Sequence, residues 1–400
     1  DKHIMNIELT KTVTVPDPIK LARYEKAPDV GPKILFFSGG SALKKASQEL
    51  TRYSHNSIHL ITTFDSGGSS AKLRKAFNMP AIGDIRNRLM ALADKTLQGN
   101  PEVYTLFSHR FPKEEKKEVL QAELQHMIRG KSELVAQIPD PMRKIIRNHL
   151  SRFLEFMPDD FDLRGASIGN LILTAGYLDN RKLLDPVIYI FSKLIEARGM
   201  VRPILNQNLH LLTELEDSTL LVGQHKLTGK ETKPIQSKVR RVHLTASEHD
   251  PSPVERSIRN KVDFHIKQAE LICYPVGSFY SSLIANLLPR GVARAIRETK
   301  CPKVFIPNTG HDPELYEHSL MDQVERLIYY LQQDFSSPVP EQELLHFVLV
   351  DKKNGRYSGD LEERKLQKMG IKVLDCTLIS PDSDPLLDSR LLTETLLSLT

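Results

Sequence analysis

The segment best suited to chemistry is FDSGGSS, residues 64–70, which follows an apolar run and precedes a basic stretch. Asp65 is predicted to lie at the carboxyl end of a strand, where open α/β sheets bind their ligands. It could hold a magnesium ion or accept a proton from an attacking hydroxyl, or it could simply cap the next helix. Glycine amides and serine hydroxyls are the donors that a phosphate group needs. The candidate phosphate ligands here are Ser66, Gly67, Gly68 and Ser69.

Charged residues follow this segment at short spacing. Lys72, Arg74 and Lys75 fall on the next predicted helix, where one or two of them could reach a bound phosphate, or all could form a solvated face. In the motif GDIRNR that comes next, Arg86 offers a planar fork that suits phosphate or carboxylate groups. The alternative is a helix capped by Asp84 with surface arginines. The candidates from this stretch are Lys72, Asp84, Arg86 and Asn87.

Two further turns are rich in glycine. The turn at 38–41, SGGS, ends an apolar strand and could present its amides to a phosphate, although it fits neither the P-loop nor G-x-G-x-x-G and could be a plain tight turn. The turn in YPVGSFY, residues 274–280, could meet a base, a sugar or a second phosphate if its strand lies beside the first two. Otherwise it is an ordinary turn with a packed tyrosine. The candidates are Gly39, Gly40, Ser41, Gly277, Ser278 and Tyr280.

The stretch GASIG, residues 165–169, matches the G-x-S-x-G pattern of serine hydrolases. That motif requires an apolar strand before the serine, and the residues DDFDLR precede it here. We therefore favour a turn, shaped by Ser167 and Asn170, that opens a helix at Leu171, and keep a hydrolase as a weaker alternative. Several histidines without regular ligand spacing are interpreted as structural or surface residues: His210, His243, His249, His265 and His311.

The elements that must position these residues alternate between strands and helices. Short apolar runs that end in glycine turns are typical of buried parallel strands, and each is followed by a helical stretch. This order predicts an α/β fold, with a Rossmann-like, mostly parallel sheet and helices on both faces. The predicted strands lie within 33–41, 57–64, 269–275, 301–308, 347–351 and 371–379, with a helix at 43–53 after the first.

The remaining segments are predicted to surround this sheet. Residues 1–32 form an arm, 33–340 the main domain, and 341–400 a C-terminal α/β extension packed on the same domain. Residues 112–154 are a helical insertion, in which Met142, Ile145, Ile146, His149 and Phe153 make one apolar face. Alternating leucines at 202–229 predict a small β-hairpin element. A closing helix is predicted to start near Asp384, its N-cap, with Pro385 in the first turn.

The amino-acid composition excludes several classes of binding partner. The 400 residues carry a formal charge of +5, only 6% aromatic residues and no tryptophan, which argues against nucleic-acid binding. Three widely spaced cysteines indicate neither disulfides nor a typical zinc site and suit a cytoplasmic location. No apolar run reaches the roughly 18 residues of a membrane helix. The sequence leaves open whether the chain forms a homodimer.

Taken together, these motifs resemble the CofD/YvcK family. The segment FDSGGSSAKLRKAFNMPAIGDIRNRLMALAD, 64–94, is similar to the family's glycine loop and GDIRN motif. The family's S-I-G-N-L turn corresponds to 167–171, and its G-P-G-S-L-Y stretch to PVGSFYSSLIANLL at 275–288. The asparagine after the next strand corresponds to Asn308. The resemblance runs in order over about 33–330.

This resemblance implies two functions. CofD-type members resemble magnesium-dependent transferases that move a phospho-group from a nucleotide compound to a hydroxyl. YvcK-type members look like non-catalytic regulators that bind UDP-sugars and influence carbon metabolism or cell shape. In the first case Asp65 is expected to position magnesium, while Asp84 and Arg86 act in catalysis. Ser66 stands where the family often has a second acid, which favours the sensor somewhat.

Overall fold

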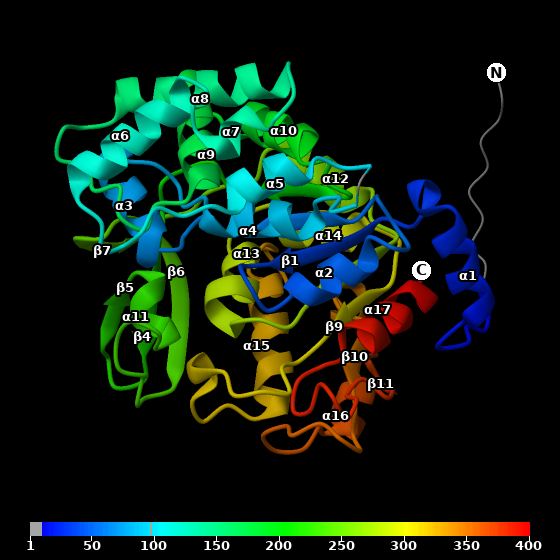
Figure 1. Cartoon of the computed structure of the whole chain (residues 1–400). Helices are drawn as coiled ribbons and strands as arrows, with labels where there is room; N and C mark the ends of the chain where they lie inside the picture. Colours follow the sequence, from blue (N-terminus) through cyan, green and yellow to red (C-terminus); the bar gives the residue numbers. More distant parts are fainter. Residues whose placement is uncertain (1–9, 97) are drawn as a thin grey trace, which may run out of the picture.

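The computed structural model describes residues 10–96 and 98–400, and its centre is a fully parallel seven-stranded sheet (Figure 1). The strand order is β11-β10-β9-β8-β1-β2-β3. The chain runs outward from β1 in one direction and from β8 in the other, so the topology switches between β1 and β8. The strands are β1 (Ile34–Ser38), β2 (Ile58–Ile61), β3 (Met200–Pro203), β8 (Leu271–Tyr274), β9 (Lys303–Phe305), β10 (Phe347–Val350) and β11 (Lys372–Asp375).

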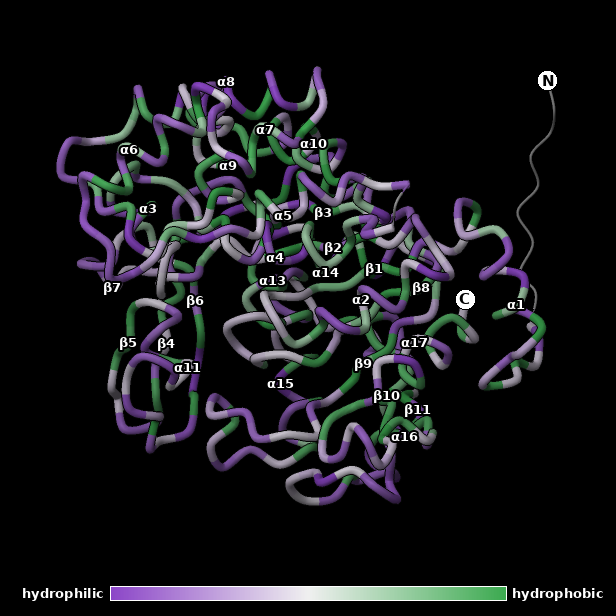
Figure 2. The backbone as a smooth tube through the Cα atoms, viewed as in Figure 1, coloured by the Kyte–Doolittle hydropathy of each residue, from purple (hydrophilic) through white to green (hydrophobic). Residues whose placement is uncertain are grey.

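Helices cover both faces of this sheet, as predicted. Successive β1 side chains alternate, so Leu35 and Phe37 join the apolar core on one face while Ile34 and Phe36 join the core on the other. Figure 2 shows hydrophobic segments gathered along these central strands. The helices around the sheet include α2 (Lys44–Leu50), α3 (Gly68–Phe77), α4 (Gly83–Leu92), α12 (Asn260–Lys267), α13 (Ala285–Leu287), α14 (Val292–Glu298) and α15 (Leu320–Gln332), with a π-helix at Phe279–Ile284.

In the described residues, the chain segment that connects β2 to β3 contains six further helices after α4. They are α5 (Pro101–Ser108), α6 (Lys117–Ile128), α7 (Glu133–Ala136), α8 (Met142–Phe156), α9 (Ile168–Asp179) and α10 (Leu184–Leu194). The buried face of α8 is Ile146, Leu150 and Phe153, whereas Ile145 points to solvent. The predicted face was therefore rotated, because the real stripe follows the i, i+4, i+7 spacing from Ile146.

A separate four-stranded antiparallel sheet, order β5-β4-β6-β7, lies beside the large one (Figure 1). Its members are β4 (His210–Leu215), β5 (Leu220–Val222), β6 (Val239–Ser247) and β7 (Asp250–Pro253), with α11 (Gln224–Thr228) after β5. The predicted hairpin is β4–β5. Its predicted start was wrong, because Arg202 belongs to β3 of the parallel sheet, where it pairs with Leu60.

The two ends of the described chain pack together. Helix α1 (Pro18–Lys26) contacts α17 (Ser389–Ser398), and the Lys20 ammonium donates to the Thr400 carbonyl at 2.6 Å. The predicted start of the closing helix was wrong: Asp388, not Asp384, is its N-cap and accepts from the amide of Arg390. The remaining short elements are α16 (Glu363–Lys368) and 3-10 turns at Pro28–Val30, Pro313–Leu315 and Glu341–Glu343. No helix within 10–96 or 98–400 is long and apolar enough to cross a membrane.

Candidate functional site

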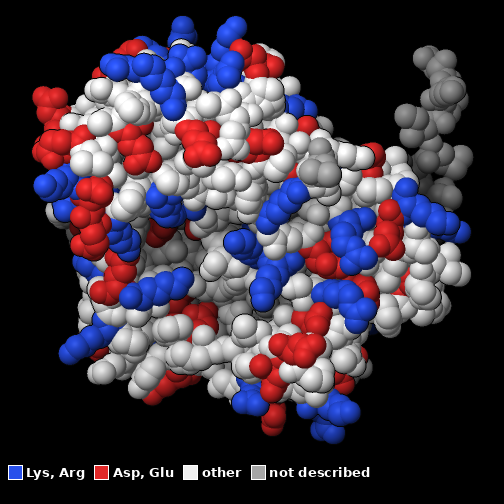
Figure 3. Space-filling view, viewed as in Figure 1, with Lys and Arg blue, Asp and Glu red and all other residues white. Residues whose placement is uncertain are grey.

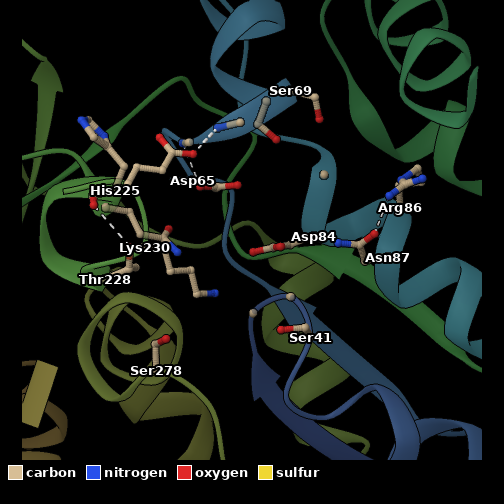
Figure 4. Close-up of a pocket in the computed structure, with 18 of the residues that line it drawn as sticks. Ser41, Asp65, Ser69, Asp84, Arg86, Asn87, His225, Thr228, Lys230 and Ser278 are labelled. Carbon is tan, nitrogen blue, oxygen red and sulfur yellow. Dashed lines mark hydrogen bonds between the residues drawn. The ribbon is translucent and has the colours of Figure 1, made fainter. Parts of the chain in front are cut away.

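A cavity of about 790 Å³ opens at the carboxyl ends of β1, β2 and β8, across the switch point of the sheet (Figure 4). Figure 3 shows a hollow on this side of the molecule, bordered by lysine and arginine side chains. Doubly wound sheets bind ligands at this position. The predicted residues that line the cavity are Gly39, Gly40, Ser41, Asp65, Gly67, Gly68, Ser69, Lys72, Asp84, Arg86, Asn87, Gly277 and Ser278.

The loop after β1 is held from behind by Arg88, which is fully buried. Its guanidinium donates to the carbonyls of Gly39 and Gly40 at 3.1 and 3.3 Å and to the Ser47 hydroxyl. In the described part of the chain, the amides of Gly40 and Ser41 have no protein acceptor. Because the carbonyls face Arg88, these amides are left for a ligand.

Both glycines of this loop are required by their neighbours. A Cβ on Gly40 would collide with Oδ1 of Asp84, and one on Gly39 would collide with the Ser282 hydroxyl. The loop therefore lies directly against the carboxylate at the start of α4. The close approach explains why this strand ends in two glycines.

The loop after β2 is organised in the same way. Arg74 is buried, and its guanidinium donates to the carbonyls of Phe64 and Asp65 at 3.1 and 2.9 Å. It also reaches the Leu209 carbonyl, so it joins the loop to the antiparallel sheet. Arg74 therefore supports the backbone, and of the three basic residues on this helix, Lys72 is the one that lines the cavity.

Asp65 and the start of α3 form the wall beside it. The Asp65 carboxylate accepts from the Gly67 amide at 3.0 Å, and Gly68 adopts a left-handed conformation with φ +52°. The N-cap residue Gly67 supplies no side-chain cap. Instead, the Gly68 amide donates to the carboxylate of Glu231 at 2.9 Å, from a segment far along the chain.

The loop after β8 lies beside the first loop, because β8 pairs with β1. Asn308 clasps it from behind: its amide donates to the Gly277 carbonyl at 2.5 Å, and its oxygen accepts from the Gly277 amide at 3.0 Å. The helix amides that follow are already occupied, since Asp312 accepts from Phe279 and Glu314 from Tyr280, both at 2.8 Å. This turn therefore contributes a wall rather than a free helix terminus.

We expect Glu314→Ala to lower the free energy of unfolding by about 3 kcal/mol, since it leaves two buried amides without acceptors. Glu314 is fully buried and also accepts from the amide of Ser281 at 2.9 Å. Burial, reinforced by the charge of Asp312, raises the pKa of Glu314 and so favours its neutral form. Glu314→Gln should therefore cost less than about 1 kcal/mol. Urea unfolding at pH 7 checks both variants, and equal losses would contradict this account.

Two carboxylates face the centre of the cavity. Burial raises the pKa of Asp84 to about 7, and the charge of Asp65 adds to the increase. Burial also raises the pKa of Asp65, against the hydrogen bond from Gly67. Carboxylates whose ionised forms disfavour each other provide a place for a cation or a proton.

Cations gather on the side of the cavity near α9. Arg86 is 7% exposed and donates to the Ser167 hydroxyl at 2.9 Å and to Asn87 at 2.6 Å. Among the described carboxylates, none forms an ion pair with Arg86, Arg110 or Lys113. Burial lowers the pKa of Arg86 to about 10, and the neighbouring Arg110 contributes to the decrease. A buried, charged guanidinium without a counter-ion is favourable for an anionic ligand.

Other cations at the cavity already have partners. Lys72 donates to the Asp162 carboxylate at 3.0 Å, and Arg164 pairs with the same carboxylate at 2.9 Å. These arginine and lysine contacts, with burial opposing them, hold the pKa of Asp162 well below its usual range. Lys72 would have to leave Asp162 in order to reach a phosphate.

Four predicted ligands lie behind the cavity wall. The Ser66 hydroxyl contacts His225 Nδ1 at 2.6 Å, and Tyr280 contacts His318 at 2.7 Å. Asn170 is buried, with its amide 3.5 Å from the Ser69 hydroxyl, and Asn308 clasps its loop as described. The structure thus places Ser66, Asn170, Tyr280 and Asn308 outside the lining.

Ser167 is the N-cap of α9 and is completely buried. Its hydroxyl accepts from Arg86, and the residues before it form no strand. The geometry of a nucleophile elbow, a serine exposed on a strand-to-helix turn, is therefore absent at this position.

Several residues at the cavity were missed by the sequence interpretation. Arg110 and Lys113 precede α6, while His225, Lys230 and Glu231 come from the segment around α11. Arg88 was noticed as basic, but its buried position was not. The available signal for Arg88 was its spacing, three residues after Ile85 and four before Leu92, which places it on the apolar stripe of α4.

The fold and the site together define a doubly wound α/β protein with a polar ligand cavity at the strand ends. The chain belongs to the CofD family, described as "2-phospho-L-lactate transferase CofD", which it matches over residues 34–379. It is thus a CofD-like, YvcK-like protein, as the motifs indicated.

Several curated relatives carry the name "Gluconeogenesis factor", among them proteins of Bacillus subtilis and Listeria monocytogenes. The protein of Bacillus subtilis is 27% identical over 88% of this chain and 93% of its own length. That of Listeria monocytogenes is 28% identical over 69% of this chain and 66% of its own length. A crystal structure of a UPF0052 family member from Bacillus halodurans shares the fold, with a TM-score of 0.65, 22% identity, and coverage of 92% of this chain and 99% of that one.

Proposed function

We propose that the cavity binds a nucleotide or nucleotide-sugar through its phosphate groups. The observation that carries this proposal is the pair of glycine loops at the switch point, each with its carbonyls held by a buried arginine. Free amides of Gly40, Ser41 and Ser69 then surround one side of the cavity, and Arg86 faces the other. The volume of about 790 Å³ is within the range of pockets for ligands of this size.

Magnesium suits this cavity as a companion of the phosphates. Proteins commonly hold Mg²⁺ through one or two carboxylates, with substrate phosphates and water completing the shell. Asp65 and Asp84 provide two such carboxylates, and their raised pKa values indicate that a cation would stabilise them. Bound there, the ion would neutralise phosphate charge. No set of three protein ligands for a metal is found among the described residues, so the ligand itself would have to contribute.

A second function, transfer of a phospho-group to a hydroxyl, is favoured by Asp84. With magnesium held by Asp65 and the phosphates, Asp84, whose pKa is about 7 in the metal-free site, could accept the proton of the attacking hydroxyl at neutral pH. The hydroxyl oxygen would bond to phosphorus while the bond to the nucleotide oxygen breaks, so charge develops on the leaving phosphate. Arg86 and the loop amides would stabilise that charge.

The other alternative is a regulator of carbon metabolism that binds a UDP-sugar without turnover; the relatives' name, "Gluconeogenesis factor", refers to carbon metabolism and to no reaction. The two differ in one experiment: a thermal-shift panel of nucleotides and UDP-sugars with and without magnesium, followed by product analysis for each ligand that binds. Binding raises the melting temperature by mass action. Binding without product would favour the regulator, and no shift with any ligand would contradict nucleotide binding.

Asp65→Asn should weaken magnesium-supported binding about 10-fold, or about 1.4 kcal/mol, since it removes one carboxylate of the cation site. The matched control is Asp382→Asn, on an exposed turn that does not line the cavity. The measurement is isothermal titration with the best ligand of the panel at saturating magnesium. Unchanged affinity in Asp65→Asn would show that the cation site is misassigned.

A further inference from the structure

The dipeptide Lys230–Glu231 lies at the cavity where a phosphate and its cation are expected under the proposed function. It follows α11 and comes from the side of the antiparallel sheet. Figure 4 shows the Lys230 side chain extending toward the cavity centre between His225, Thr228 and Asp84. The segment therefore reaches into a site built by a different sheet.

Glu231 takes the position of an anion. Its Oε1 accepts from the Gly68 amide at 2.9 Å, at the N-terminus of a ten-residue helix that has no cap of its own. The same oxygen lies 2.9 Å from the place where a Cβ of Gly67 would be, so a larger residue there would require the Glu231 side chain to shift. A helix N-terminus stabilises carboxylate and phosphate by the same amides and dipole.

Lys230 takes the position of a cation. Burial raises the pKa of both Asp65 and Asp84, and the charge of Lys230 acts in the opposite direction on each. Among the described residues, no carboxylate forms an ion pair with Lys230. Its charge therefore influences both Asp65 and Asp84. Lys230 thus faces the acids that would hold a metal ion, and Glu231 binds an amide that would hold a phosphate.

Few contacts hold this segment in place. Residues 230–234 are exposed, and Gly229 before them adopts φ +66°. The Thr232 hydroxyl makes only long hydrogen bonds of 3.4 Å to the carbonyls of His225 and Lys226. A short exposed segment after a left-handed glycine can move with little loss of packing.

We propose that Lys230–Glu231 is an internal competitor that occupies the phosphate site of the free protein and is displaced by the ligand. Glu231 must leave the Gly68 amide before a phosphate can accept from it, because the two anions would repel each other there. Ligand binding therefore releases residues 229–234. This release would couple occupancy of the cavity to the surface beside α11.

The test uses pyrophosphate and UDP, each with magnesium, on the full chain. Glu231→Ala should bind pyrophosphate about 10-fold more tightly than the unchanged protein, because the competing carboxylate is gone. Glu231→Gln, which keeps an acceptor without the charge, should show a smaller gain. Glu216→Ala, which replaces an exposed glutamate in the turn after β4, is the control and should leave affinity unchanged.

Hydrogen exchange gives a second readout. Pyrophosphate should keep peptides covering 66–70 protected while it increases exchange at 229–234. Equal or weaker binding by Glu231→Ala, or no binding by either protein, would overturn the internal competitor. Pyrophosphate binding that tightens in Glu231→Ala without any binding of UDP or other nucleotides would support the competitor and overturn the proposed nucleotide function.

Discussion

Arg88→Met is expected to weaken nucleotide binding about 30-fold, or about 2 kcal/mol, and to lower the free energy of unfolding by about 3 kcal/mol. Arg88 makes no contact with the cavity, so both effects would act through the first glycine loop. Its guanidinium turns two carbonyls away from the ligand, and methionine, of similar length, provides no donor. The loop amides would then lose their fixed direction.

Arg88→Met should also change the pKa of Asp84. Arg88 lowers the pKa of Asp84, against the larger effect of burial. Without the guanidinium, Asp84 should hold its proton to a higher pH, and magnesium-supported binding should require more alkaline conditions. A general loss of stability would not shift this pH dependence, so the pH profile separates loop support from plain unfolding.

Two further variants serve as controls: Arg88→Lys, a conservative change at the same position, and Arg52→Met, the same kind of change at the surface. Lysine keeps the charge but not the fork, so it should restore the pH profile while recovering only part of the affinity. Arg52 lies half-exposed on the surface, where it pairs with Glu25 and Glu49, and its replacement should change little. Titration calorimetry and urea unfolding give both quantities. Wild-type affinity in Arg88→Met at every pH would show that the first loop does not bind the ligand.

The glycine loops could be predicted because their signals are local. Each apolar run ends in glycines within a few residues, and Asp65 follows its strand directly. The meeting of the first and third loops also followed from topology, once β8 was placed beside β1. Local pattern and strand order thus determine most of the cavity wall.

The contacts that complete the site could not be predicted in this way. Arg88 donates to carbonyls 49 and 48 positions earlier, and Glu231 accepts from an amide 163 positions earlier. Such pairs depend on packing between elements, which a single sequence does not display. Arg74 illustrates the difference: its place on a basic helix indicated a phosphate, whereas burial turned it toward backbone carbonyls.

Errors in the outer elements have a similar origin. Arg202 comes shortly before the alternating leucines of β4, and only its pairing with Leu60 of β2 assigns it to the edge strand of the parallel sheet. At the C-terminus, both Asp384 and Asp388 are suitable N-caps. The later one is used because its carboxylate reaches the amides of Arg390 and Leu391.

Asp84→Asn is expected to stabilise the protein and impair the site at once. Because burial raises the pKa of Asp84 to about 7, the folded state keeps a proton that the unfolded chain has lost between about pH 4 and pH 7. Stability due to this group therefore falls as the pH rises through that window. Asparagine carries no such charge, so the variant should gain about 2 kcal/mol at pH 8 and almost nothing near pH 4.

Whereas Asp84→Asn should raise stability, it should weaken magnesium-supported binding. Asparagine removes one of the two carboxylates that would hold magnesium, so the gain in nucleotide affinity on adding magnesium should fall about 10-fold. Affinity without magnesium should be equal or higher, because less negative charge faces the phosphates. Any phospho-group transfer should be lost, since no base remains on the hydroxyl.

Unfolding at pH 4, 6 and 8, with titrations at zero and saturating magnesium, measures both effects. Asp382→Asn controls for the loss of one exposed carboxylate. Equal stability of Asp84→Asn and the unchanged protein at pH 8 would show that the folded state does not disfavour the ionised form of Asp84. A variant that is stabilised yet keeps its full response to magnesium would leave Asp65 as the acid that holds the ion, and would move the proton acceptor away from α4.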